Sequence, residues 1–144
     1  MDWSKAAIAG LVAGVVRAIY DYGLYCLIMR GTYHAHEEVF RQQANYVFYP
    51  IIEILIAVAA GLFFARSYSA WKPGVKGGLT FGFWIGVITF FTTFFIPLVF
   101  KGFPYFLTWC WASIGFIGWL IFGAIVASIY KEPAPDESII QERS

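Results

Sequence analysis

The chain has 144 residues, of which 60% are hydrophobic and only 13% are charged, and its mean hydropathy is +0.67. A soluble domain of this size covers itself with polar side chains and usually carries about a quarter charged residues, so a small water-soluble globule is excluded. The formal net charge of +1 offers no basic footprint for nucleic acid. The composition therefore predicts an all-α membrane protein, in which helices satisfy the backbone hydrogen bonds within lipid.

Four apolar runs are long enough to cross a bilayer. They cover residues 6–29, 47–65, 79–100 and 106–130, and each is close to or above the ~20 residues that a spanning helix needs. We expect a bundle of four transmembrane helices over residues 1–131. Residues 132–144 are polar with two prolines and are expected to form a mobile tail.

Lysine and arginine residues in the connections predict the orientation of the bundle. The side that holds both termini carries Lys5, Arg66, Lys72, Lys76, Lys131 and Arg143, against Arg30, Arg41 and Lys101 on the other side. Because positively charged connections are retained in the cytoplasm, this division predicts that both termini are cytoplasmic.

The connection between the first two spans, residues 30–46, is the longest. Tyr33, Phe40, Ala44 and Val47 recur at helical spacing, so part of this segment is expected to lie along the interface or to extend the second span. Aromatic residues near the predicted span ends suggest interfacial belts. They are Trp3, Tyr46, Tyr49, Trp71, Tyr105, Trp109 and Tyr130.

Small residues recur four positions apart in every span. The predicted packing positions are Gly10, Gly14, Ala57, Gly61, Gly74, Gly78, Gly82, Gly86, Gly123 and Ala127. Since lipid provides no hydrophobic drive between helices, close backbone approach at such positions favours a compact bundle. A shift of 72 residues also places Gly10 and Gly14 on Gly82 and Gly86. This match suggests two tandem helix pairs, or a chance similarity between glycine-rich helices.

Two opposite charges interrupt the first span. Arg17 and Asp21 are four residues apart, so their side chains meet on one helix face. At about 100° per residue, that face is the one that carries Gly10 and Gly14, which predicts that the charges point toward other helices. Glu53 occupies the small-residue face of the second span at a comparable depth. These positions predict an intramembrane cluster with two acids and one base.

Two interpretations of this cluster stay open. Two carboxylates beside one guanidinium in a low-dielectric site resist full ionisation, so the cluster could exchange a proton, coordinate a cation or bind a polar head group. It could instead lock the first helix to the second. Thr89 and Thr93 in the third span could complete the hydrogen bonds of the cluster, or donate to carbonyl groups of their own helix.

Other candidate sites are weaker. His34 and His36 are two residues apart, which does not place two imidazoles on one helix face, so a solvated loop competes with a metal site assisted by Glu37 or Glu38. No metal or cofactor is predicted, although the phenylalanine-rich third span could hold a bound lipid or another apolar molecule. The sequence contains no phosphate loop, dinucleotide fingerprint or nucleophile–base pattern, which makes an enzyme the least favoured class.

Three segments carry a family resemblance. MDWSKAAIAGLVAGVV, GVKGGLTFGFWIGVI and IFGAIVASIYK resemble small bacterial four-helix integral membrane proteins of unknown function. This resemblance implies four spans and a bacterial cytoplasmic membrane, and it implies no activity.

The sequence favours a non-catalytic role. We expect either an accessory or assembly subunit of a larger membrane complex, or a homo-oligomer, with membrane lipid and a protein partner or second copy as its contacts. The alternative is a small transporter or proton-coupled binding protein that uses Arg17, Asp21 and Glu53.

Overall fold

The computed structural model describes residues 2–40 and 48–131, and within these ranges the only regular structure is helical. The long helices are α1 (Trp3–Tyr22), α3 (Phe48–Arg66), α4 (Val75–Thr93) and α6 (Tyr105–Ile129). Shorter elements are the π-helical η1 (Gly23–Ile28), α2 (Arg30–His34), the 3-10 turn η2 (Tyr68–Ala70) and α5 (Phe95–Val99). Four segments are long and apolar enough to cross a membrane: Trp3–Ile28, Phe48–Arg66, Val75–Val99 and Tyr105–Ile129. The prediction of four such helices is confirmed.

Local chemistry sets the helix boundaries. The Asp2 side chain caps α1 by accepting a hydrogen bond of 3.0 Å from the backbone N–H of Lys5. Gly74 precedes α4 with a φ of 77°, a conformation that favours glycine, and α4 begins at Val75 rather than at residue 79. The third span breaks at Phe94 because Pro97 has no N–H to donate to the carbonyl of Thr93.

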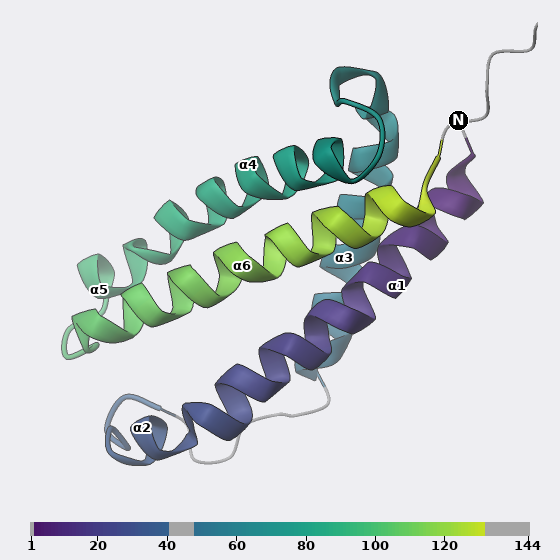
Figure 1. Cartoon of the computed structure of the whole chain (residues 1–144). Helices are drawn as coiled ribbons and strands as arrows, with labels where there is room; N and C mark the ends of the chain where they lie inside the picture. Colours follow the sequence, from purple (N-terminus) through teal and green to yellow (C-terminus); the bar gives the residue numbers. More distant parts are fainter. Residues whose placement is uncertain (1, 41–47, 132–144) are drawn as a thin grey trace, which may run out of the picture.

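The long helices form two closely packed pairs, α1 with α3 and α4 with α6, and the pairs meet where α1 contacts α6. Figure 1 shows α1 and α6 near each other where α1 begins, and diverging toward the ends marked by α2 and α5. We call the end of the bundle where α1 begins the closed end, because the buried core lies there. We call the opposite end, where α1 and α4 end, the cavity end.

Small residues allow close backbone contact between α1 and α3. A Cβ atom added at Gly61 would lie 2.6 Å from the Cα of Gly10, and one at Gly10 would lie 2.8 Å from the Ala57 carbonyl oxygen. A Cβ at Gly14 would overlap the Cβ of Ala57. Neither helix has room for a larger side chain along this seam.

The seam between α4 and α6 has the same character. A Cβ at Gly78 would overlap the carbonyl oxygen of Gly123 and the Cβ of Ala127. Gly82 lies against the backbone of Trp119, and a Cβ at Gly86 would be 2.9 Å from the Phe116 ring. Gly74, which the spacing places in this seam, is instead the residue before the helix. A Cβ there would meet nothing within 4 Å, so the prediction for Gly74 is wrong.

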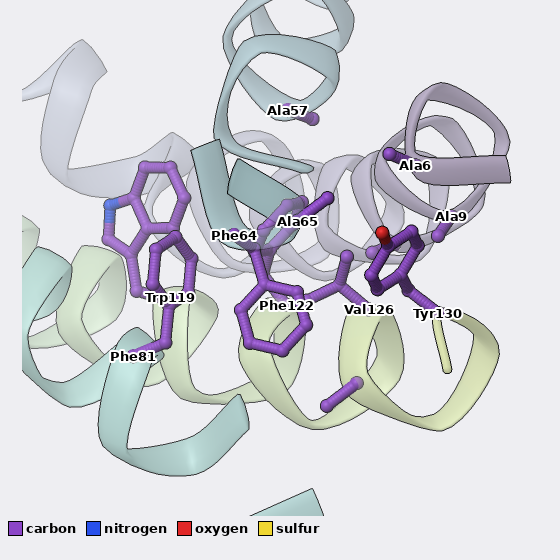
Figure 2. Packing of buried hydrophobic residues seen from close by; sticks show 12 residues of the cluster. Ala6, Ala9, Ala57, Phe64, Ala65, Phe81, Trp119, Phe122, Val126 and Tyr130 are labelled. Carbon is purple, nitrogen blue, oxygen red and sulfur yellow. The ribbon is translucent and has the colours of Figure 1, made fainter. Parts of the chain in front are cut away.

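The buried apolar core lies at the closed end (Figure 2). Phe122, Val126 and Tyr130 from the last part of the chain pack against Phe64 of α3 and Phe81 of α4, with alanines of α1 beside them. Tyr130 is fully buried here, which corrects its predicted place in an interfacial aromatic belt. Alanine on α1 lets α6 approach closely, and the rings fill the remaining volume.

Large apolar side chains cover the outside of the bundle. Leu98, Ile28 and Val99 are more than 70% exposed, at 75%, 72% and 71%. Contiguous apolar surface of this kind is rare on a soluble monomer and is what a lipid-facing surface requires. Ala44 and Val47, Tyr46, Arg41 and the tail at 132–144 lie outside the described residues. The orientation of the termini and the internal repeat stay predictions.

Candidate functional site

A cavity of about 930 Å³ lies at the cavity end. All four spans line it, with the following residues facing it: Arg17, Asp21, Tyr22, Tyr25, Cys26 and Leu27 of the first span, Tyr49, Glu53 and Ile56 of α3, Thr89, Thr93 and Ile96 of the third span, and Trp111, Ala112, Gly115 and Trp119 of α6. Arg30, Tyr33, His34 and Phe40 complete the lining. The volume falls within the range of ordinary small-molecule sites, roughly 300–1,000 Å³.

The structure brings Arg17, Asp21 and Glu53 together at this cavity. Arg17 Nε lies 3.4 Å from Asp21 Oδ2, and Arg17 Nη2 lies 3.7 Å from Glu53 Oε2. The first contact joins residues one turn apart on α1, and the second joins α1 to α3. Asp21 is nearly inaccessible, with 2% of its side chain exposed, whereas the Glu53 side chain is 15% exposed. The two acids therefore share one base but differ in access.

Trp119 is the residue of this cluster that sequence reasoning missed. The Arg17 guanidinium carbon lies 4.0 Å from the centre of a Trp119 ring, a cation–π contact. Next to Trp119, a Cβ at Gly118 would be 3.3 Å from Arg17 Nε and 3.5 Å from Asp21 Oδ1. The absence of a side chain at Gly118 of α6 thus leaves room for the Arg17–Asp21 ion pair of α1. No local sequence pattern predicts that Gly118 and Trp119 lie beside Arg17, because their positions depend on the rotation of α6 about its own axis.

Some polar atoms of the cluster lack hydrogen-bond partners among the described residues. They are Nε and Nη1 of Arg17 and Oδ1 of Asp21. Both side chains are at least nine-tenths buried and both line the cavity. A buried polar atom without a partner is costly, of order 1–3 kcal/mol or more when charged. The cluster consequently retains unused hydrogen-bonding capacity beside the cavity.

Thr89 and Thr93 line the cavity without hydrogen bonds to the ionic cluster. The Thr89 hydroxyl donates to the carbonyls of Ile85 and Gly86, both at 3.1 Å, and the Thr93 hydroxyl donates to the Thr89 carbonyl at 2.8 Å. Of the two alternatives, bonding within the helix is the one observed. These threonines form part of the cavity wall on the third span.

Aromatic residues form much of the remaining wall. The Tyr25 hydroxyl donates to the Trp111 carbonyl at 3.3 Å, and Trp111 Nε1 donates to the Tyr33 hydroxyl at 2.9 Å. Burial raises the pKa of the Tyr33 hydroxyl, which stays neutral at ordinary pH. The Phe40 ring contacts those of Tyr33 and Trp111 in tilted and edge-to-face arrangements, with ring centres 4.8 and 5.8 Å away. Segment 30–40 is thereby attached to α6.

The π-helical segment η1 positions part of this wall. The Met29 N–H donates to the Leu24 carbonyl at 3.0 Å, five residues back, so the helix is wider here than an α-helix. Tyr25 and Cys26 lie in this segment and face the cavity. Such π-bulges often occur at functional positions because they redirect side chains.

The weak metal candidates do not assemble a site in residues 2–40 and 48–131. His34 Nδ1 lies 3.9 Å from Glu37 Oε1 in an exposed contact, and His36 Nδ1, in the turn after α2, lies 2.9 Å from the carbonyl oxygen of Thr32. No group of three potential metal ligands occurs in this part of the chain. Cys26 and Cys110 are both free thiols.

Comparison with known proteins gives no relative for this arrangement: no protein-family model, no curated protein and no solved structure matches the chain.

Proposed function

We propose that this chain is an integral membrane protein that binds a small amphipathic molecule in the cavity between its four spans. The observation that carries the proposal is the placement of Arg17, Asp21 and Glu53 on one cavity of about 930 Å³. Ionisable groups inside a membrane are expensive, and they usually face a polar cavity or a substrate path. Binding of this kind is the first step of the transporter or binding-protein alternative.

A purely structural lock between helices accounts for less of the geometry. The lock expected from the sequence joins the first helix to the second, and the contact of Arg17 with Glu53 would form it, although the small-residue seam already joins α1 to α3. Glu53 adds a second acid that is partly exposed and sits at 3.7 Å from the shared base. A lock also gives no reason for a cavity of this size lined by aromatic and hydroxyl-bearing residues. A bound molecule with a polar head accounts for both.

An accessory-subunit or homo-oligomer role stays a prediction of the sequence. The exposed apolar side chains of the described spans are those that lipid requires, and they single out no surface for a protein partner. Ligand binding is therefore the function that the geometry supports best, and catalysis has no dedicated arrangement among the described residues.

Cavity occupancy can be tested by native mass spectrometry of the protein extracted in mild detergent. Gly115 lines the cavity and a Cβ there would meet nothing within 4 Å, so Gly115→Trp places a large ring in the cavity without disturbing the helix seams. Gly23→Leu is the matched control, because Gly23 is equally open but does not line the cavity.

The wild type and the Gly23→Leu variant are expected to retain a bound small molecule that Gly115→Trp loses. Equal occupancy of all three proteins, or an empty wild type that does not acquire a ligand from native membrane extract, would contradict the proposal.

A further inference from the structure

We propose that the cavity takes an organic cation, a protonated amine on an aromatic or aliphatic body, and that Glu53 is the carboxylate that meets its ammonium group. This inference rests on the proposed function, to which it adds the ligand class and the recognising residue. Three independent features support it: the charge balance of the buried cluster, the unequal roles of the two acids, and the aromatic lining.

The buried part of the cavity holds more acidic than basic side chains. Arg17 faces Asp21 and Glu53, which leaves one acid without a base of its own. The other basic side chains in the lining, Arg30 and His34, are exposed, and water and salt screen charges at such positions. An anionic ligand would meet the two carboxyl groups of Asp21 and Glu53 in the buried part of the cavity. A cation would balance them.

The two acids have different tasks. Asp21 is held by Arg17 at 3.4 Å within α1, and the guanidinium face is covered by Trp119. The longer contact to Glu53, 3.7 Å, and the greater exposure of its side chain leave Glu53 the accessible acid. Asp21 Oδ1, buried and without a hydrogen-bond partner among the described residues, is a further acceptor for an N–H donor. The two acids require a donor, whereas Nε and Nη1 of Arg17, which also lack hydrogen-bond partners among the described residues, require an acceptor.

Aromatic rings surround the same volume. Tyr49 lies one helical turn before Glu53 on α3, so both side chains occupy one face. Tyr25 and Trp111 lie on the first span and on α6, with ring centres 6.3 Å apart in an edge-to-face arrangement. Ring faces attract cations, and their edges and bodies accept an apolar group. A carboxylate beside tyrosine and tryptophan rings is the chemistry that recognises an amine with an organic body.

Cys26 provides a reporter inside the cavity. It is a free, half-buried thiol that lines the volume, whereas Cys110 does not line it. In a Cys110→Ser protein reconstituted in nanodiscs, the rate of reaction of Cys26 with a neutral maleimide can be measured at pH 7. The probes are 4-phenylbutylammonium, 4-phenylbutanol and 4-phenylbutanoate, which share one body and differ in charge.

The amine is expected to slow labelling about tenfold at ten times its Kd, because only about a tenth of the sites then remain free. The alcohol should protect weakly and the carboxylate not at all. Glu53→Gln should weaken protection by the amine at least about tenfold, since it removes a charged acceptor. It should leave the weak effect of the alcohol unchanged. In Gly115→Trp, no probe should protect.

Equal protection by the amine and the alcohol, or undiminished protection in Glu53→Gln, would overturn the assignment of a cation while leaving a ligand cavity in place. Failure of all three probes to protect, together with unaltered labelling of Cys26 in Gly115→Trp, would refute the proposed function itself. The comparison of the three compounds on the site with Glu53 intact remains decisive even if Glu53→Gln fails to fold.

Discussion

Arg17 is the residue on which the buried charges of this protein depend. It contacts Asp21 at 3.4 Å and Glu53 at 3.7 Å, and its guanidinium lies over Trp119. Removal of one partner from a buried ion pair is far more costly than removal of both, since the remaining charge has neither water nor a counterion. The pair should therefore show strong energetic coupling.

A double-mutant cycle with Arg17→Gln and Asp21→Asn tests this coupling. Arg17→Gln alone is expected to lower the free energy of unfolding by about 3–5 kcal/mol, because it strands Asp21 and Glu53. The double variant should lose less than the sum of the single losses by about 1 kcal/mol or more. Unfolding titrations with sodium dodecyl sulfate in mixed micelles give the values. Strictly additive losses would show that the two charges do not act as a pair.

The candidate site could be predicted only in part from sequence. The spacing of Arg17 and Asp21 fixes their shared face, and counting residues from the span ends places Glu53 at their depth. Trp119 and Trp111 could not be placed, because the rotation of α6 about its own axis is decided by packing with α4. Tyr25 also escaped prediction, since it lies in a π-helical segment that shifts the face on which side chains emerge.

At the scale of the helix, glycine residues have no side chain and therefore allow close backbone contact at two seams, α1–α3 and α4–α6. Gly123 of α6 is a sensitive example, because an added Cβ would overlap the Gly78 carbonyl oxygen on α4. That neighbour is backbone and cannot rotate away. Gly115, two turns earlier on the same helix, has no atom within 4 Å of an added Cβ. The two glycines form a matched pair.

Gly123→Ala is expected to destabilise the bundle by about 1–3 kcal/mol, since the α4–α6 seam must open. Gly115→Ala should be neutral or stabilising by up to about 1 kcal/mol, because alanine favours the helix. The same detergent titration measures both variants. A larger loss for Gly115→Ala than for Gly123→Ala would contradict the assignment of the seam.

The helices themselves were largely accessible to prediction. Long apolar runs identify spans reliably because lipid allows few alternatives to a helix. The early start of α4 at Val75 was missed because Gly77 and Gly78 reduce the apolar signal, although Gly78 packs tightly against α6. The break at Phe94 has a sequence cause in Pro97, four residues after Thr93.

At the scale of the whole molecule, side-chain size is graded along the bundle. Ala6, Ala9 and Ala13 on α1 let α6 approach at the closed end, where the rings of α3, α4 and α6 fill the core. At the cavity end, Tyr20 of α1 and Tyr25 of η1 reach backbone carbonyls of α6, with hydrogen bonds of 3.4 and 3.3 Å. Long polar side chains thus bridge a wider gap, and the cavity lies where the helix pairs diverge.

The orientation of this graded bundle can be tested through its charges. Lys5, Arg66, Lys72, Lys76 and Lys131 belong to the closed end, where the Lys5 ammonium donates to the Lys131 carbonyl at 3.5 Å. Since the positive residues favour the cytoplasmic side, the closed end should be cytoplasmic and the cavity end should face outward.

A green fluorescent protein fused after Ser144 is expected to fluoresce in a bacterial host, and alkaline phosphatase fused after Gly102 should be active. Lys72→Gln with Lys76→Gln reduces the full count on the terminal side from six to four against three, so this variant should give a mixed orientation. The exposed pair Lys72→Arg and Lys76→Arg keeps the charge and serves as the control. An active phosphatase at the C-terminus together with an inactive one after Gly102 would show the opposite orientation, and would place the cavity on the cytoplasmic side.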